Sequence, residues 1–230
     1  MSRSKARATS SRRPTASSWQ ASSTRSSPRI RWSSDGPGRP PGEGMTEKTH
    51  VALLRGINVG GKNKLLMSDL AAMFVESGCE DVRTYIQSGN VVFRADPELA
   101  RLVPDVIGAA IAECFGYRVP VLTRTGGELA AIVRENPFLR GGAETGKLHV
   151  GFLAEQPEAA AVDSLDRDRS PPDEFAVLGR EVYFHCPLGL ARTKFTAPYF
   201  ESKLSTTMTV RNWRTVLRLR EMTAGLGGCR

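Results

Sequence analysis

The sequence predicts an α+β protein made of two tandem ferredoxin-like (βαββαβ) units packed together and preceded by a disordered tail. Three observations lead to this prediction. Short apolar runs alternate with segments of helical periodicity, hairpin turn signals occur once in each half, and the first 44 residues contain no Leu, Val or Phe. The expected organisation is a tail over 1–44, a first subdomain over 45–125, and a second over 126–230 that ends in a helix.

The tail carries most of the charge. Its 44 residues include nine Lys+Arg and two Asp+Glu, so they hold +7 of the net +8, while the remaining residues carry 23 basic and 22 acidic side chains. Twelve of the 44 are Ser. Such a segment buries too little apolar surface to offset the entropy of ordering, so we expect disorder. A basic tail of this kind can hold anionic polymers non-specifically.

Two interpretations of the tail remain open. Its Arg- and Ser-rich composition resembles an organellar transit peptide, although it lacks the apolar stretch of a secretory signal. Alternatively, the natural chain starts at Met45 and the upstream residues are not normally translated. The abrupt onset of apolar patterning at Val51 favours the second interpretation.

The first subdomain follows the order βαββαβ. Its elements are predicted from apolar periodicity and from glycine and cap positions. They are a strand over 51–57, buried on both faces; a helix capped by Ser68 and ended by Gly78; strands over 82–87 and 90–93 joined at Ser88-Gly89-Asn90; a helix from Leu99 to Gly116 interrupted by Pro104; and a strand over 117–123.

The second subdomain repeats this order after a bridging helix. Its expected elements are a bridging helix over 128–134; a strand over 148–153; a helix over 158–165; strands over 175–178 and 182–186 turning at Gly179-Arg180; a helix over 197–204 with Thr196 as cap; a strand over 207–210; and a terminal helix capped by Asn212. The chain length suits two such units.

A glycine-rich loop is the first candidate site. Residues 56–63 match the phosphate-loop pattern G-x-x-x-x-G-K-[ST] except at the last position, where Asn63 replaces the magnesium-binding hydroxyl. The next helix also starts too late for a true nucleotide loop. An anion-binding nest remains, formed by exposed amides and nearby basic residues. The candidate residues are Arg55, Asn58, Gly60, Gly61, Lys62, Asn63 and Lys64. A plain glycine turn is the competing interpretation.

Other polar groups are weaker candidates. Gln87, Ser88 and Asn90 are expected to form a turn at the opposite end of the sheet from the glycine loop. Arg192 and Lys194 form a second basic segment, and Arg211, Arg214 and Arg218 have the spacing of a basic helix stripe. Trp213 either stacks on a base or anchors the core, and its spacing to Val216 and Leu217 favours the core.

Several classes of chemistry are disfavoured. The four cysteines form no CxxC pair, which argues against a zinc site or disulfide scaffold and suits a reducing compartment. The three histidines (His50, His149, His185) are scattered, and no metal or triad motif occurs, so no metal or cofactor is expected. No apolar run is long enough to cross a bilayer. We therefore expect a cytoplasmic protein.

Six motifs carry a family resemblance. They are LLRGINVGGKNK (Leu53–Lys64), TYIQSGNVVF (Thr84–Phe93), NPF (Asn136–Phe138), LHVGFL (Leu148–Leu153), ARTKF (Ala191–Phe195) and VRNWRTVLRL (Val210–Leu219). Over residues 48–224 the chain resembles the bacterial family called domain of unknown function 1697. The likeness does not reach residues 1–44.

The resemblance implies fold more than activity. It implies two related α+β subdomains and brings no established reaction or cofactor. Its recurring polar positions correspond here to Arg55, Asn58, Lys62, Asn63, Gln87, Ser88, Asn90, Lys194, Asn212 and Trp213. One departure is that Arg214 follows Asn212-Trp213 where the family usually has Asn, which argues against an amide-specific role at position 214.

The leading functional hypothesis is a module that binds a phosphate-bearing ligand, a nucleotide or nucleic acid, through the loop over 56–64. One alternative is a small-molecule enzyme that holds a substrate phosphate at this loop, with Asp69 as the nearest carboxylate. Another is a protein–protein interaction module with an exposed sheet edge. Composition alone does not separate these three hypotheses, and it predicts no oligomeric state.

Overall fold

The computed structural model describes residues 48–226. The first half of this part of the chain contains seven elements. They are β1 (Lys48–Leu54), α1 (Met67–Glu76), β2 (Glu80–Tyr85), β3 (Asn90–Ala95), α2 (Pro97–Phe115), β4 (Val121–Thr125) and α3 (Gly126–Glu135). The tail predicted over 1–44, the proposed start at Met45 and Cys229 lie outside the described residues.

The second half continues with shorter helices. Its elements are α4 (Pro137–Arg140), the 3₁₀ turn η2 (Thr145–Lys147), β5 (Leu148–Leu153), α5 (Ala159–Asp163), β6 (Glu174–Leu178), β7 (Glu181–His185), α6 (Ala197–Leu204), β8 (Met208–Asn212) and α7 (Trp213–Leu226). None of the helices within residues 48–226 has the length and apolarity needed to cross a membrane.

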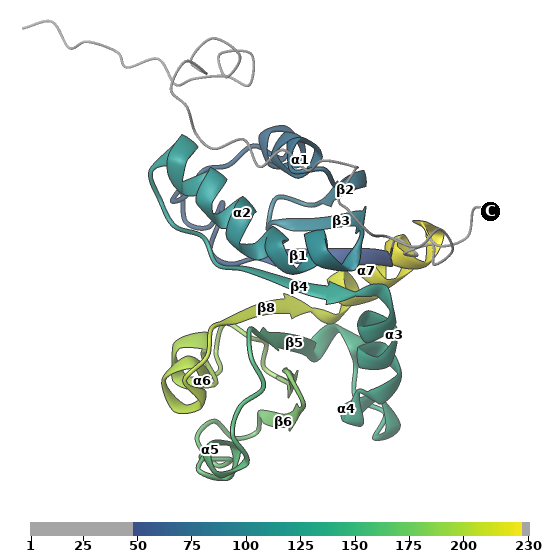
Figure 1. Ribbon diagram of the computed structural model, residues 1–230. Coiled ribbons are helices and arrows are strands. Elements are labelled where there is room, and N and C mark those ends of the chain that lie inside the picture. Colours follow the sequence, from purple (N-terminus) through teal and green to yellow (C-terminus); the bar gives the residue numbers. More distant parts are fainter. Residues whose placement is uncertain (1–47, 227–230) are drawn as a thin grey trace, which may run out of the picture. The chain divides into compact units, whose positions relative to one another are not determined.

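Each half contains one four-stranded antiparallel sheet, which confirms the predicted α+β class (Figure 1). The strand order is β2-β3-β1-β4 in the first sheet and β6-β7-β5-β8 in the second. The strands β1 and β5 occupy equivalent positions in the two sheets, and the residues that pair with them are equivalent too. His50 pairs with Thr125 in the first sheet, as His149 pairs with Asn212 in the second.

Helices cover the outer face of each sheet. Leu54 of β1 and Phe93 of β3 pack against Phe74 of α1 and Ile107 of α2. In the second half, Phe184 of β7 packs in the same way against Phe200 of α6. Because successive strand residues point to opposite faces, Val51 and Leu53 face away from α1 and α2.

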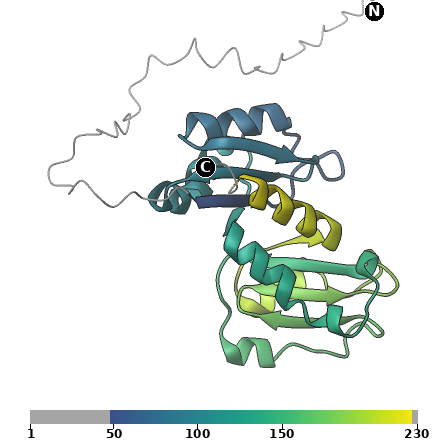
Figure 2. The same cartoon turned by 90° about the vertical axis from the view of Figure 1, so that its right-hand side faces the viewer.

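The inner faces of the two sheets share one central core, to which α3 and α7 contribute. Val51 and Leu53 from β1 belong to it together with Phe152 from β5 and Trp213 from α7. Helix α7, yellow in Figure 2, contacts strands of both sheets. The start of α3 lies so close to the end of α7 that a Cβ added to Gly126 would come within 3.3 Å of Thr223. β1 is thus buried on both faces, as its continuous apolar run predicts.

Local signals placed most elements within a few residues, and three details were wrong. β1 ends at Leu54, so 55–57 belong to the following loop. Helix α1 starts at Met67, and Leu66 occupies its N-cap position without a side-chain hydrogen bond, so Ser68 is not the cap. Thr196 does occupy the N-cap position of α6, but its side chain makes no capping bond.

Candidate functional site

The glycine-rich connection between β1 and α1 folds back on itself. Val59 and Lys62 form an isolated antiparallel bridge, with the Lys62 amide donating to the Val59 carbonyl over 3.0 Å. Gly60 and Gly61 form the tip between them, both at positive φ. This small hairpin differs from a phosphate loop, in which the glycine turn leads directly into a helix.

Two asparagines hold this loop from inside. The Asn58 Oδ1 accepts from the Leu65 amide at 2.9 Å, and its Nδ2 donates to the Leu65 carbonyl at 2.8 Å. The Asn63 Nδ2 donates to the Gly56 carbonyl at 3.0 Å. Both side chains are therefore engaged in loop structure, and both backbones lie at positive φ, where Asn is tolerated better than most residues.

The hairpin turn between β2 and β3 lies beside this loop, so the prediction that they lie at opposite ends of the sheet was wrong. Asn58 Nδ2 also donates to the Gln87 carbonyl at 2.9 Å, and the Leu54 amide donates to the Gly89 carbonyl at 2.8 Å. The physical reason is the pairing pattern. β1 and β2 are each antiparallel to β3, so they run in the same direction and end at the same edge.

At this edge the connections are longer in the first half than in the second, whereas the second half has the longer connections over 164–173 and 186–196. The chain uses residues 55–66 to pass from β1 to α1, but only 154–158 to pass from β5 to α5. The turn between β2 and β3 takes residues 86–89, whereas 179–180 suffice between β6 and β7. Since the shorter versions close the same arrangement, the additional residues in the first half are not needed for the fold, and binding groups concentrate in such loops.

The exposed side chains of the two loops are basic and apolar, apart from that of Gln87. Lys62 and Lys64 are exposed, and neither has an ion-pair partner within residues 48–226. Val59 and Leu66 are each 65% exposed and Ile86 is 50% exposed. Ile86 also lies at φ +50°, a conformation that β-branched residues rarely adopt and that marks local strain.

Arg55 is bound to the second half. Its guanidinium donates to Glu201 of α6 over 2.6 Å, and the other oxygen of Glu201 accepts from the Met208 amide at 2.8 Å. The Arg55 charge is thus paired. It positions the start of the loop against α6 rather than offering a free cation.

Arg211 was predicted as part of a helix stripe with Arg214 and Arg218, and this prediction was wrong. It belongs to strand β8, is 8% exposed, and reaches into the first sheet. Its Nη2 donates to the Leu54 carbonyl at 2.7 Å and to the Ser88 carbonyl at 3.1 Å. The helix begins only at Trp213, so residue 211 follows strand geometry, and inter-sheet packing buries it.

Asn90 completes the surroundings of Arg211. Its Oδ1 accepts from Arg211 Nε at 2.6 Å, while its Nδ2 donates to the Tyr85 carbonyl and to Ser88 Oγ, each at 3.0 Å. Asn90 is fully buried. It therefore connects the turn to β8 and cannot touch a ligand at the surface.

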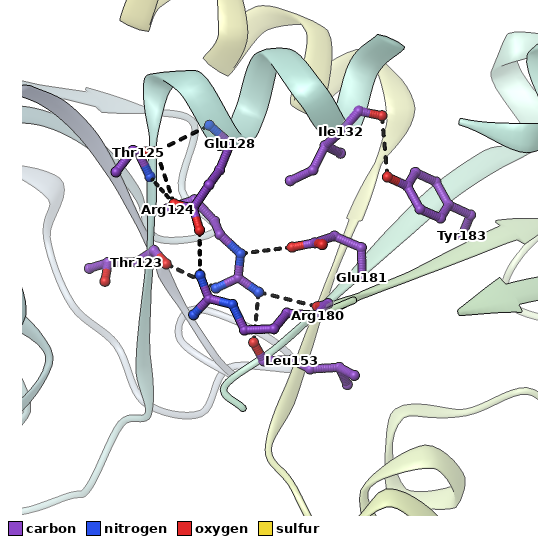
Figure 3. A network of polar contacts seen from close by, with 9 residues as sticks. All are labelled: Thr123, Arg124, Thr125, Glu128, Ile132, Leu153, Arg180, Glu181 and Tyr183. Atoms are coloured by element: carbon purple, nitrogen blue, oxygen red, sulfur yellow. Dashed lines mark hydrogen bonds and ion pairs between the residues drawn. The ribbon is translucent and has the colours of Figure 1, made fainter. Parts of the chain in front are cut away.

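Arg124 makes the reciprocal contacts from the first half to the second (Figure 3). Its Nη2 donates to the Leu153 carbonyl at 2.7 Å and to the Arg180 carbonyl at 3.2 Å, and its Nε donates to Glu181 at 2.8 Å. Arg180 in turn pairs with Glu128, which forms a capping box with Thr125 at the start of α3. Two guanidinium groups and two carboxylates thus lie together in this network.

The remaining candidate residues do not join the loop. Trp213 is 2% exposed and packs in the central core, as its helical spacing favours, so it cannot stack on a base. Asn212 caps α7 by accepting from the Thr215 amide at 2.8 Å, as predicted. The side chains of Arg192 and Lys194 are exposed on the connection between β7 and α6.

That connection meets a different edge of the protein. The Lys194 amide donates to Ser170 Oγ at 2.9 Å, and its carbonyl accepts from Arg169 Nε at 3.2 Å. The Cys186 amide binds the Lys147 carbonyl, next to the start of β5. The end of β5, by contrast, is the edge that Arg124 reaches. Arg192 and Lys194 thus form a separate basic segment.

Sequence reasoning missed both interior arginines as inter-sheet contacts. Arg124 is absent from the predicted candidate residues, and Arg211 was predicted to lie on a helix surface. The available signal was a basic residue directly after the predicted fourth strand of each unit, Arg124 after 117–123 and Arg211 after 207–210. Each lies one residue before the residue that caps the following helix. Aligning the two halves element by element would have revealed it.

The fold and the loops define a two-sheet α+β protein whose halves repeat one arrangement and whose first half carries enlarged loops at one edge. The sequence model of the protein of unknown function family DUF1697 matches residues 47–183, and the chain belongs to this family. No curated protein matches the chain.

Among solved structures, the conserved bacterial protein SP0830 from Streptococcus pneumoniae is similar. The match has a TM-score of 0.61 at 22% sequence identity and covers 77% of this chain and 99% of that chain. This likeness concerns the fold.

Proposed function

We propose that this protein is a cytoplasmic module that binds a phosphate-bearing ligand at the connection over 55–66, with the turn over 86–89 beside it. The observation that carries the proposal is the enlargement of these two connections in the first half alone, with Lys62 and Lys64 unpaired among residues 48–226. Each half is proposed to be a ferredoxin-like unit, supported by the shared strand order in which the fourth strand lies beside the first.

The chemistry of the loop suits an anion. Gly60 and Gly61 have no atom within 4 Å of the position of an added Cβ, so a ligand can approach their backbone closely. Ammonium groups bind phosphate as flexible point charges, and the unpaired lysines supply two of them. The loop itself is held by Asn58 and Asn63, so these cations extend from an ordered support.

A titration of the full chain with methyl phosphate and with an RNA oligonucleotide, followed by backbone amide chemical shifts, tests this proposal. We expect shifts at Gly60, Gly61 and Lys62. Lys62→Ala with Lys64→Ala should weaken binding about tenfold, or ~1.4 kcal/mol, with little change in stability. Lys48→Ala is the matched control, since Lys48 is an exposed lysine at the opposite end of β1.

Unchanged affinity in the double variant would contradict the proposed site. Binding that disappears when the chain is started at Met45 would assign it to the basic tail, whose affinity falls steeply with salt.

A protein–protein module is the second candidate. Val59, Leu66 and Ile86 are exposed apolar side chains. Val59 follows Asn58 in the sequence, and the other two are next to Leu65 and Gln87, whose carbonyls accept hydrogen bonds from the Asn58 side chain. Replacing all three by Ser should abolish association with a protein partner but leave methyl phosphate binding intact.

The enzyme alternative has less support. Asp69, its nearest carboxylate in sequence, lies in the first turn of α1, where an acid interacts favourably with the helix dipole. The enzyme alternative would be favoured if Asp69→Asn abolished turnover of a phosphate ester but retained binding.

A further inference from the structure

Arg124 and Arg211 occupy equivalent positions in the two halves, but the side chain that accepts a hydrogen bond from Nε is a carboxylate for Arg124 and a neutral amide for Arg211. In the register of the two sheets, Arg124 pairs with Val51 as Arg211 pairs with Val150. The residues that accept from the two Nε atoms are also equivalent, because Asn90 pairs with Leu53 as Glu181 pairs with Phe152. The second half thus offers a carboxylate where the first half offers a neutral amide.

The charge around Arg124 is balanced. Glu181 accepts directly from its guanidinium over 2.8 Å, and Glu128 pairs with the neighbouring Arg180 (Figure 3). Glu181 and Glu128 both act to raise the pKa of Arg124 against the dominant effect of burial, which lowers it. The network therefore projects little net charge.

Among residues 48–226, the charge of Arg211 has no such partner. Every acceptor of its guanidinium is neutral: the side chains of Asn90 and Thr209 and the carbonyls of Leu54, Ser88, Gly89 and Val210. Burial lowers the pKa of Arg211 to about 10, and no carboxylate in the described part of the chain opposes this shift. The group still carries its proton at neutral pH, so an unneutralised positive charge lies inside the protein.

This charge lies directly beneath the enlarged loops. Leu54 is the residue from which the connection over 55–66 departs, and Ser88 and Gly89 belong to the neighbouring turn. A charge in a low-dielectric interior is screened far less than one in water, so its field adds to that of Lys62 and Lys64. The nearby pair of Arg55 with Glu201 is neutral overall.

We infer that Arg211, left unneutralised by Asn90, makes this edge select dianionic phosphate monoesters over monoanionic phosphodiesters. The inference rests on the proposed function, because it assigns the ligand class of the same loop. The energy of an anion in the field of a fixed charge is proportional to the charge of the anion, so a dianion gains twice as much as a monoanion. A terminal phosphate group, rather than the backbone of a nucleic acid, is therefore the expected ligand.

Asn90→Asp tests this inference, with Asn90→Ala as the matched control. Both variants lose the Nδ2 donor to Tyr85 and Ser88, but only Asp places a carboxylate against Arg211. The probes are methyl phosphate and dimethyl phosphate at pH 8, where the monoester is a dianion because its second pKa is about 6. Relative to Asn90→Ala, we expect Asn90→Asp to lower methyl phosphate affinity about tenfold and dimethyl phosphate affinity about threefold.

Equal affinities of the Asp and Ala variants would overturn the role of Arg211. If Lys62→Ala still weakened binding in that case, the proposed function would stand without it. If the wild-type chain bound neither probe, both proposals would fall. Should Asn90→Asp not fold, Ser88→Asp against Ser88→Asn brings a carboxylate to the same turn, and the same comparison of the two probes decides.

Discussion

Arg124 and Arg211 each donate a hydrogen bond of 2.7 Å to the last carbonyl of the other half's first strand, Leu153 for Arg124 and Leu54 for Arg211. Each Nη1 also donates at 2.9 Å to the carbonyl of the residue before it. The two contacts are thus reciprocal, and they join the halves at the edges where their central strands end. A strand end buried in this way needs donors for its carbonyls, and the guanidinium of the opposite half provides them.

Arg211→Lys should destabilise the fold by about 3 kcal/mol. An ammonium group cannot reproduce the planar fork that satisfies Leu54, Ser88 and Asn90 together, so buried acceptors lose their partner. Urea unfolding followed by circular dichroism measures the change. Arg214→Lys is the control, because Arg214 is exposed on α7, and it should alter stability by less than about 0.5 kcal/mol. Equal effects of the two substitutions would show that the interior contacts contribute little.

Gly89→Ala should cost about 2–4 kcal/mol. Gly89 lies at φ +74°, and an added Cβ would approach Leu54 Cβ to 2.7 Å and Ile57 Cδ1 to 2.8 Å, so the turn would have to move away from β1. Gly116→Ala separates the two causes. It has a similar φ of +75° but no atom within 4 Å, so only the backbone strain of about 1 kcal/mol should remain. A Gly89 variant no worse than the Gly116 variant would contradict the close approach.

Stability should fall as the pH is lowered from 7.5 to 5.5. Burial lowers the pKa of His50 and that of His149 below 6.5, so the unfolded chain binds these two protons more readily than the folded protein. The stability that they confer is full above about pH 6.5 and is lost as the pH falls below that value. Chemical unfolding at several pH values measures the slope.

A variant with His50→Gln and His149→Gln provides the control for this slope. It should show a flatter dependence over the same range, whatever its absolute stability. Glu128 does not contribute to the slope between pH 7.5 and 5.5, because it titrates below this range. Its hydrogen bonds with Thr125 and its interaction with Arg180 outweigh burial and hold its pKa below the usual range of a carboxyl group. A slope that is equally steep without both histidines would exclude them as its source.

Cys79 and Cys186 should not react with iodoacetamide at pH 8 in the folded protein. Burial raises the pKa of Cys79 to about 12 and that of Cys186 to about 11, and the thiolate is the reactive form. Mass spectrometry of digested protein should find both residues modified only after denaturation. Modification of either in the native state would indicate that its part of the core opens readily.

Elements with local signals could be predicted from the amino-acid sequence. The strand over 148–153 and the helix over 197–204 have the boundaries that apolar periodicity and Pro198 predict, and the turn at Gly179-Arg180 lies where glycine allows it. The bias of charge toward the first 44 residues, the core position of Trp213 and the cap formed by Asn212 also follow from composition and spacing.

Which polar residues lie inside depends on contacts between distant parts of the chain. The residues that bury Arg211, and leave Arg214 exposed, are distant in the sequence, because the acceptors of Arg211 on Leu54 and Asn90 are 157 and 121 residues away. Likewise, the contact of Asn58 with Gln87 depends on both β1 and β2 pairing with β3. Local sequence sets the direction in which a backbone runs, but the pairing of distant strands sets which ends meet and which charges are buried. For this reason Arg211, predicted to lie on the surface of a helix, instead forms an interior contact between the two sheets.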